Sequence, residues 1–130
     1  MKHLFHLIFG LLAITVSAQE KNCADIRVGN FKHIGELSGI TLISRTETIQ
    51  HEENIEFGII TEDSVKWIND CTFRLIPSRM IKNEGKLEME VDMTLIVEVE
   101  ILRVDPKSYL QRMTSTLTGE SVTTEILRIN

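Results

Sequence analysis

Polar side chains suited to holding a ligand gather at Arg45, Gln50 and Glu52. Arg45 directly follows the stretch 39–44, and Gln50 and Glu52 lie in the stretch 48–52. The composition and flanking turn residues of these stretches predict neighbouring short strands. Inside a closed sheet, an arginine and a carboxylate would orient the polar end of a small molecule. A structural ion pair and a plain exposed face are the two alternatives that the sequence leaves open for this trio.

Catalytic chemistry has weaker support. His51 is a candidate base beside Glu52, but successive residues of a strand face opposite sides of a sheet, so the two would not act together. Ser44 and Ser64 supply hydroxyl groups without a nucleophile elbow, and we find no paired-histidine or phosphate-loop motif. We therefore expect no catalytic residue and no enzyme, and a small hydrolase is the least favoured alternative.

A row of carboxylates between residues 88 and 100 raises the question of a cation site. Side chains two apart on a strand stand roughly 7 Å from each other, whereas calcium needs about six to eight oxygens around one ion. We interpret the row as the solvated outer face of a long strand, and we expect neither metal nor cofactor. The row consists of Glu88, Glu90, Asp92, Glu98 and Glu100.

The chain begins with features of an export signal. Lys2 precedes an apolar run, residues 4–16, which is about 13 residues long, whereas a membrane span needs about 20. Small residues at 16–18 and polar residues after them predict cleavage behind residue 18. The sequence thus predicts a signal peptide (1–18), a single β-domain (19–130), a periplasmic or secreted location and no transmembrane segment.

Export determines how the two cysteines are interpreted. Cys23 and Cys71 are the only cysteines, and an oxidising compartment favours a disulfide between them. The closed loop of about 49 residues would stabilise the fold by roughly 4 kcal/mol in the chain-entropy model. A free catalytic thiol or a metal-binding pair is the alternative.

Length and charge exclude other classes of protein. The chain has 130 residues and a formal net charge of −5, from 14 Lys+Arg and 19 Asp+Glu. That length fits one domain rather than a multidomain enzyme. An acidic chain also lacks the basic surface that nucleic acid requires, so we expect no nucleic-acid partner.

Alternation of apolar and polar residues predicts strands throughout the domain. It is clearest over 87–101, which we predict as one half-buried strand with a bend near 94–96. Turn residues at 105–108 and 118–120 separate it from predicted strands at 109–117 and 121–129, which completes a three-stranded meander. Its apolar positions are Leu87, Met89, Val91, Met93, Leu95, Val97, Val99 and Ile101.

The first half contains shorter predicted strands at 26–28, 39–44, 48–52, 55–61, 64–68 and 71–76. Turns are expected at 53–54, 62–63 and 69–70. Pro77 is expected to end the series, and 78–85 to form a polar connection. Trp67 and Phe73 are the predicted core aromatics, with Trp67 packed near the disulfide rather than serving as a stacking platform.

About eight short strands without a helix of 12 residues predict an all-β antiparallel meander. Such a sheet must close on itself or cover one face. A small barrel is the favoured architecture, and a two-sheet sandwich is the alternative.

Three motifs support a resemblance: Cys23-x5-Gly29-x-Phe31, Ile43-x-Arg45-Thr46-x3-Gln50-x-Glu52, and Val65-x-Trp67-Ile68-x-Asp70-Cys71. As a set they resemble the uncharacterised small secreted β-proteins of Bacteroidetes-type bacteria. No catalytic or binding residues are established for that family, so the resemblance implies none here. Gly29-x-Phe31 also resembles the opening Gly-x-Trp of lipocalin-like barrels, which implies a lipocalin-like form of the predicted barrel.

Two functions remain. The first is a non-enzymatic exported β-domain that binds a small apolar or amphipathic ligand. The alternative is a protein-interaction or accessory module of the cell envelope without a ligand cavity. The alternate positions of 87–101 that would face inward all carry large side chains. These side chains would fill the interior of the barrel, which favours the alternative or a very small pocket.

Overall fold

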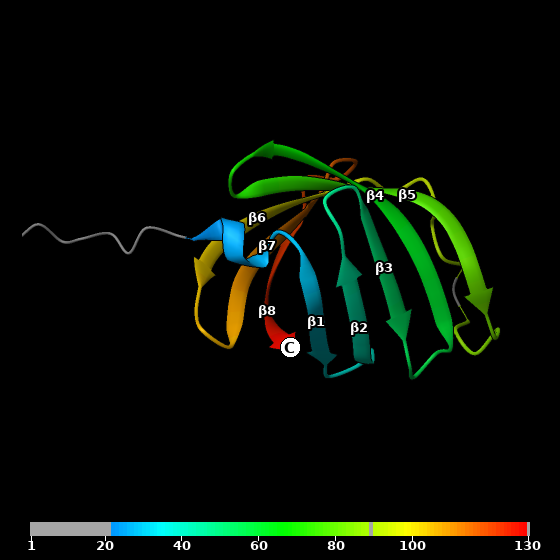
Figure 1. Cartoon of the computed structure of the whole chain (residues 1–130). Helices are drawn as coiled ribbons and strands as arrows, with labels where there is room; N and C mark the ends of the chain where they lie inside the picture. Colours follow the sequence, from blue (N-terminus) through cyan, green and yellow to red (C-terminus); the bar gives the residue numbers. More distant parts are fainter. Residues whose placement is uncertain (1–21, 89, 130) are drawn as a thin grey trace, which may run out of the picture.

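The computed structural model describes residues 22–88 and 90–129, and the predicted signal peptide lies outside these described residues. They form eight strands preceded by one turn of 3-10 helix, η1 (Figure 1). The elements are η1 (Cys23–Ile26), β1 (Gly29–Gly35), β2 (Gly39–Arg45), β3 (Ile49–Asn54), β4 (Ile59–Asn69), β5 (Thr72–Asn83), β6 (Val97–Val104), β7 (Ser108–Ser115) and β8 (Ser121–Ile129).

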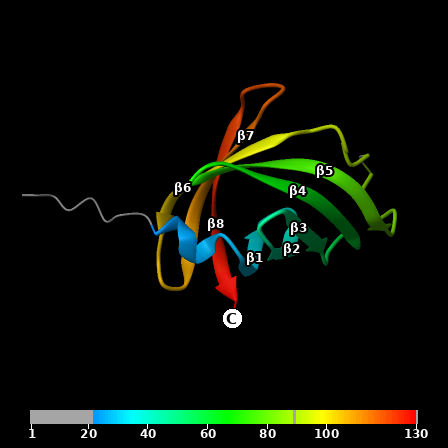
Figure 2. The same ribbon diagram turned by 45° about the horizontal axis from the view of Figure 1, so that its top comes forward.

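The eight strands form a closed antiparallel barrel. Each strand pairs with the next along the chain, and β8 returns to pair with β1. The closing contact is short and runs from Asn30↔Ile129 to Lys32↔Leu127. The curved sheet is visible from two directions (Figures 1 and 2). The predicted all-β meander and small lipocalin-like barrel are therefore confirmed, and the alternative two-sheet sandwich is not formed.

The two ends of the barrel differ. Because successive strands run in opposite directions, the connections at 46–48, 70–71 and 105–107 lie at one end, and those at 36–38, 55–58 and 116–120 lie at the other. η1 covers the first end, where it contacts β6 and where Ile26 is fully buried. We call this end the floor and the opposite end the mouth.

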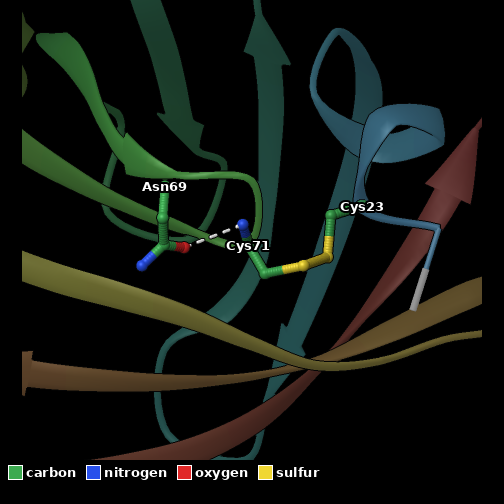
Figure 3. The surroundings of a disulfide bond; sticks show 3 residues. All are labelled: Cys23, Asn69 and Cys71. Atoms are coloured by element: carbon green, nitrogen blue, oxygen red, sulfur yellow. Dashed lines mark hydrogen bonds between the residues drawn. A yellow bond between two sulfur atoms is a disulfide. The ribbon is translucent and has the colours of Figure 1, made fainter. Parts of the chain in front are cut away.

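The predicted disulfide is present and fastens η1 to the barrel. Cys23 and Cys71 have a Cα–Cα distance of 5.4 Å, and Cys71 lies in the turn between β4 and β5 (Figure 3). The same turn is held by Asn69, whose Oδ1 accepts a hydrogen bond from the backbone N–H of Cys71 at 3.0 Å. The bond therefore joins the start of the described chain to the floor.

The predicted core aromatics lie next to each other. Phe73 is buried, and its ring centroid lies 4.6 Å from that of Trp67. Trp67 is partly buried and packs against the core cluster that includes Cys23. The guanidinium of Arg27 stacks over the Trp67 ring at 4.4 Å. Trp67 therefore forms the edge of the core, where a cation covers its exposed side.

The prediction of one strand over 87–101 is wrong for most of its length. β6 begins at Val97, and the described residues between β5 and β6, 84–88 and 90–96, form an irregular connection. β5 is longer than predicted: it continues through Pro77 to Asn83, so 78–85 is mostly strand rather than loop. Proline has no N–H to donate, and the ladder between β5 and β6 stops at Leu75↔Val97, just before Pro77. The connection is left without a partner strand for this reason.

The carboxylate row is consequently divided. Glu88, Glu90 and Asp92 lie on the irregular connection rather than on a strand. Glu98 and Glu100 do lie on β6, where they pair with Arg74 at 3.2 Å and Arg112 at 3.3 Å.

Several boundaries in the first half also differ from the prediction. The expected turn at 62–63 lies inside β4, where the pairing with β5 shifts register instead of ending. The two strands predicted at 55–61 and 64–68 are one strand, preceded by a turn at 55–58. The predicted strand at 26–28 is not formed, because Ile26 ends η1 and residues 27 and 28 form a bend before β1. In the second half, β8 has the predicted bounds, and β7 agrees to within two residues.

Candidate functional site

A cavity of about 610 Å³ occupies the barrel from the mouth down to Arg45. Inward positions of the strands line it, together with Ser38 and Phe57 from two connections at the mouth and Leu87 and Val91 from the irregular connection. Its lining is His33, Ser38, Thr41, Ile43, Arg45, Gln50, Glu52, Asn54, Phe57, Ile59, Thr61, Phe73, Leu75, Leu87, Val91, Tyr109, Gln111, Met113, Val122, Thr124 and Ile126. The interior is therefore not filled by large side chains, contrary to what the 87–101 pattern indicates.

The lining is divided into polar and apolar walls. β2 and β3 place a polar strip along one side, from Asn54 near the mouth through Glu52 to Gln50 at depth. Apolar side chains of β7, β8 and the irregular connection supply much of the rest, among them Met113 and Ile126. This division suits a molecule with an apolar body and one polar end.

Arg45 closes the cavity at depth and is 2% exposed. Its Nη2 donates to the carbonyl of Ile26 at 2.7 Å and to Tyr109 Oη at 3.1 Å. Its Nε donates to the carbonyl of Arg27 at 3.3 Å, and Nη1 donates to Gln50 Oε1 at 2.9 Å. Arg45 thus satisfies the two carbonyls at the end of η1, which would otherwise be buried without partners.

Aromatic rings surround the same guanidinium. The rings of Phe31 and Phe73 lie 4.6 Å and 4.8 Å from the central carbon of Arg45, and the ring of Tyr109 lies at 5.7 Å. Phe31 and Tyr109 also meet edge to face at 5.3 Å. The buried charge is stabilised by ring faces and by hydrogen bonds.

The structure brings the predicted trio together, with Gln50 between the two charges. Gln50 accepts from Arg45 and donates through Nε2 to Glu52 Oε1 at 3.1 Å. The relation between Arg45 and Glu52 is therefore a relay through an amide and not a direct ion pair.

Asp63, a second acidic residue, lies close to Glu52. The pKa of Glu52 is raised to about 7, chiefly by burial and next by the neighbouring charge of Asp63, while the hydrogen bond from Gln50 and the charge of Arg45 oppose the rise. Burial also raises the pKa of Asp63, opposed by a hydrogen bond with Glu52. A raised pKa near neutrality makes Glu52 a titratable group in the cavity wall.

Sequence reasoning missed Asp63 and Tyr109. Asp63 was assigned to a turn, although it lies in β4 opposite Gln50. Tyr109 is fully buried, and burial raises its pKa against the opposing influence of Arg45. The sequence could have indicated Tyr109 through strand alternation, because Tyr109, Gln111 and Met113 are alternate residues of β7 and all line the cavity.

The mouth is shaped by Asn54. Its Nδ2 donates to the carbonyl of Ser38 at 2.8 Å and to Thr41 Oγ1 at 3.1 Å, and its Oδ1 accepts from the backbone N–H of Phe57 at 2.8 Å. One side chain therefore fixes the β1–β2 and β3–β4 hairpins relative to each other at the entrance.

The candidate catalytic groups lie elsewhere. Ser44 and His51 are register partners on the parity of β2 and β3 that faces away from the cavity, and Ser64 is exposed. Within 22–88 and 90–129, no group of three or more His, Cys, Asp or Glu side chains is arranged to hold a metal ion. Over the same residues, no helix is long and apolar enough to cross a membrane.

Comparison of the chain with protein-family models, with curated proteins and with solved structures gave no match in any of the three. The resemblance to small secreted β-proteins therefore stays a prediction.

Proposed function

We propose that this chain is an exported, non-enzymatic binding domain that holds a small amphipathic molecule inside its barrel. The cavity carries the proposal. Its volume of about 610 Å³ lies within the range of roughly 300–1,000 Å³ that is typical of small-molecule sites. Its lining combines an apolar wall with a short strip of converging polar groups, one of which has a strongly shifted pKa.

Other observations support the remaining parts of this proposal. The disulfide is typical of proteins that fold in an oxidising compartment, which favours a periplasmic or secreted location. The candidate nucleophiles Ser44 and Ser64 lie outside the cavity, which favours binding over hydrolysis. The alternative, an interaction module without a cavity, depended on large side chains filling the interior, and the cavity weighs against it.

Uptake of N-phenyl-1-naphthylamine, a neutral dye that fluoresces in apolar surroundings, tests the proposal. We expect the wild-type protein to bind it and Met113→Trp to reduce the affinity at least about tenfold, because the indole would occupy the apolar wall. Thr123→Trp is the matched control, since Thr123 is exposed on the neighbouring strand and lies outside the cavity lining.

The two variants separate cavity binding from surface adsorption. Equal dye binding by the wild type and Met113→Trp would contradict the proposal, as would the absence of binding to the wild type. Circular dichroism and urea unfolding of both variants would establish that the barrel is retained.

A further inference from the structure

The polar strip contains two groups of opposite charge, and the structure distinguishes their roles. This inference rests on the proposed ligand-binding function and concerns the chemical class of the ligand. Arg45 is the obvious partner for an anion, yet four hydrogen bonds already occupy its N–H groups, out of the five that an arginine has. Its planar faces lie against Phe31 and Phe73. An anionic head group would have to compete with the contacts that close the floor.

Gln50 is equally committed. Its carbonyl oxygen accepts from Arg45, and its amide nitrogen donates to Glu52. The hydrogen bond from Gln50 reaches one carboxyl oxygen of Glu52. The second oxygen receives no hydrogen bond from Gln50. A carboxylate offers about four acceptor positions, so Glu52 can receive a donor from a ligand without losing this contact.

The surroundings of Glu52 present few competing charges. In the ladders it lies between Ile43 of β2 and Thr61 of β4, which are both uncharged. The titratable groups that face it are Arg45, held in the floor, Asp63, whose charge raises the pKa of Glu52, and Tyr109 across the barrel. His33 of β1 also lines the cavity. Among the described residues that line the cavity, Glu52 is the one with an acidic side chain.

The mouth carries the same sign of charge. Acidic side chains on its hairpins and on the irregular connection outnumber the basic ones in the described part of these segments. Lys86 of the connection and Lys82 at the adjacent end of β5 are both paired with Glu84, at 2.7 Å and 2.9 Å. A rim of one sign raises the local concentration of ions of the opposite sign. The acidic side chains are Glu36, Glu56, Glu84, Glu88, Glu90, Asp92 and Glu120.

We propose that the barrel selects a cationic amphiphile, namely a primary or secondary amine on an apolar body, whose ammonium group binds the carboxylate of Glu52 while its body lies against the apolar wall. The acidic mouth favours entry of such a molecule and disfavours a fatty acid. A charge-assisted hydrogen bond away from bulk water supplies the preference.

The ionisation of Glu52 makes this preference dependent on pH. The pKa of Glu52 in the empty cavity is about 7, so above this value the carboxylate is ready to accept the ammonium group. Below it, binding of the amine must first release the proton of Glu52. The preference for an amine therefore weakens as the pH falls through about 7. The titratable groups around Glu52 are Arg45, Asp63, Tyr109 and His33.

Competition among three ligands of equal chain length tests the inference. Decylamine, decanol and decanoate would each displace the bound naphthylamine dye at about pH 8, where the amine and the acid are charged. We expect decylamine to compete at about tenfold to hundredfold lower concentration than decanoate, with decanol between them. Glu52→Gln should abolish the advantage of decylamine over decanol. Gln is the neutral counterpart of protonated Glu and can still donate to Asp63.

Glu53→Gln is the matched control, because it removes the same charge from the opposite face of β3 and should leave the order of the three ligands unchanged. Stronger competition by decanoate, or an advantage of decylamine that persists in Glu52→Gln, would overturn the inference while the dye still binds. Failure of the dye to bind would instead overturn the proposed function.

Discussion

Arg45 shows how one buried side chain organises the end of the barrel. A guanidinium inside a protein loses its hydration, and this cost is offset only when hydrogen bonds and charge partners replace the water. Here the two carbonyls after η1, the amide of Gln50 and the hydroxyl of Tyr109 take that role. The same contacts connect η1, β2, β3 and β7. Arg45 therefore contributes to closure of the floor as much as to the cavity wall.

Replacement of Arg45 by methionine should destabilise the protein by about 3–5 kcal/mol, because it leaves several buried polar groups without partners. Urea unfolding would measure the loss. Arg112→Met removes an exposed pair with Glu100, in which both side chains remain nearly half exposed, and should cost about 1 kcal/mol or less. Similar losses in the two variants would contradict the assigned role of Arg45.

The candidate site could be predicted from the sequence only in part. Arg45, Gln50 and Glu52 are close in the chain, so strand parity and one short hairpin suffice to place them on one face. Asp63 and Tyr109 join them through the pairing of β3 with β4 and through closure of the barrel. Neither contact follows from local pattern, because register across strands is set by the whole sheet.

At the scale of elements, η1 is too short to be stable alone, and its position depends on the disulfide and on the contacts of Arg45. A single helical turn gains little from its own hydrogen bonds. The Cys23–Cys71 bond ties it to the β4–β5 turn, at the end of the barrel where Ile26 and Phe73 are buried. The bond thus stabilises the part of the fold that closes the cavity from below.

Removal of this bond in the double variant Cys23→Ala/Cys71→Ala should lower the free energy of unfolding by roughly 4 kcal/mol. Urea unfolding of the variant and of the oxidised wild type would measure the difference. Mass spectrometry after alkylation under native, non-reducing conditions should find no modified thiol in the wild type. Two modified thiols there would contradict the disulfide.

The strands show which parts of the fold are encoded locally. Ser121–Ile129 forms with its predicted bounds because turn residues precede it, and Gly119 adopts a φ of 73° in that turn. The pattern over 87–101 is equally regular, yet a strand forms only from Val97 onward. Alternation predicts which face a residue would present, but a strand also needs a partner, and Pro77 limits the one available.

At the scale of the whole molecule, a partly apolar barrel carries a titratable acid pair in its interior. The pKa of Glu52 is raised from 4.5 to about 7 in the folded protein, and burial shifts the pKa of Asp63 in the same direction. The folded state therefore holds protons that the unfolded chain has released. The stabilisation associated with protonated Glu52 is fully present below about pH 4.5 and is lost as the pH rises through about 7.

Glu52→Gln should remove this dependence. Relative to the wild type, the variant should gain about 3 kcal/mol of stability between pH 4.5 and pH 8, since each unit of pKa shift corresponds to about 1.4 kcal/mol. Urea unfolding across that range, with Glu53→Gln as the control, would measure the gain. Parallel pH profiles for the wild type and Glu52→Gln would contradict the raised pKa.

The second half of β5 has a consequence for the protein in concentrated solution. From Pro77 to Asn83 this strand pairs with β4 but not with β6, so one of its edges is not covered by the ladder. Such an edge is a template on which another copy could add a strand, the first step toward fibres. Pro77 interrupts the row of donors along it, and Arg79 and Lys82 place charges nearby. Pro77 and these charges should therefore disfavour the addition of a strand from another copy at this edge.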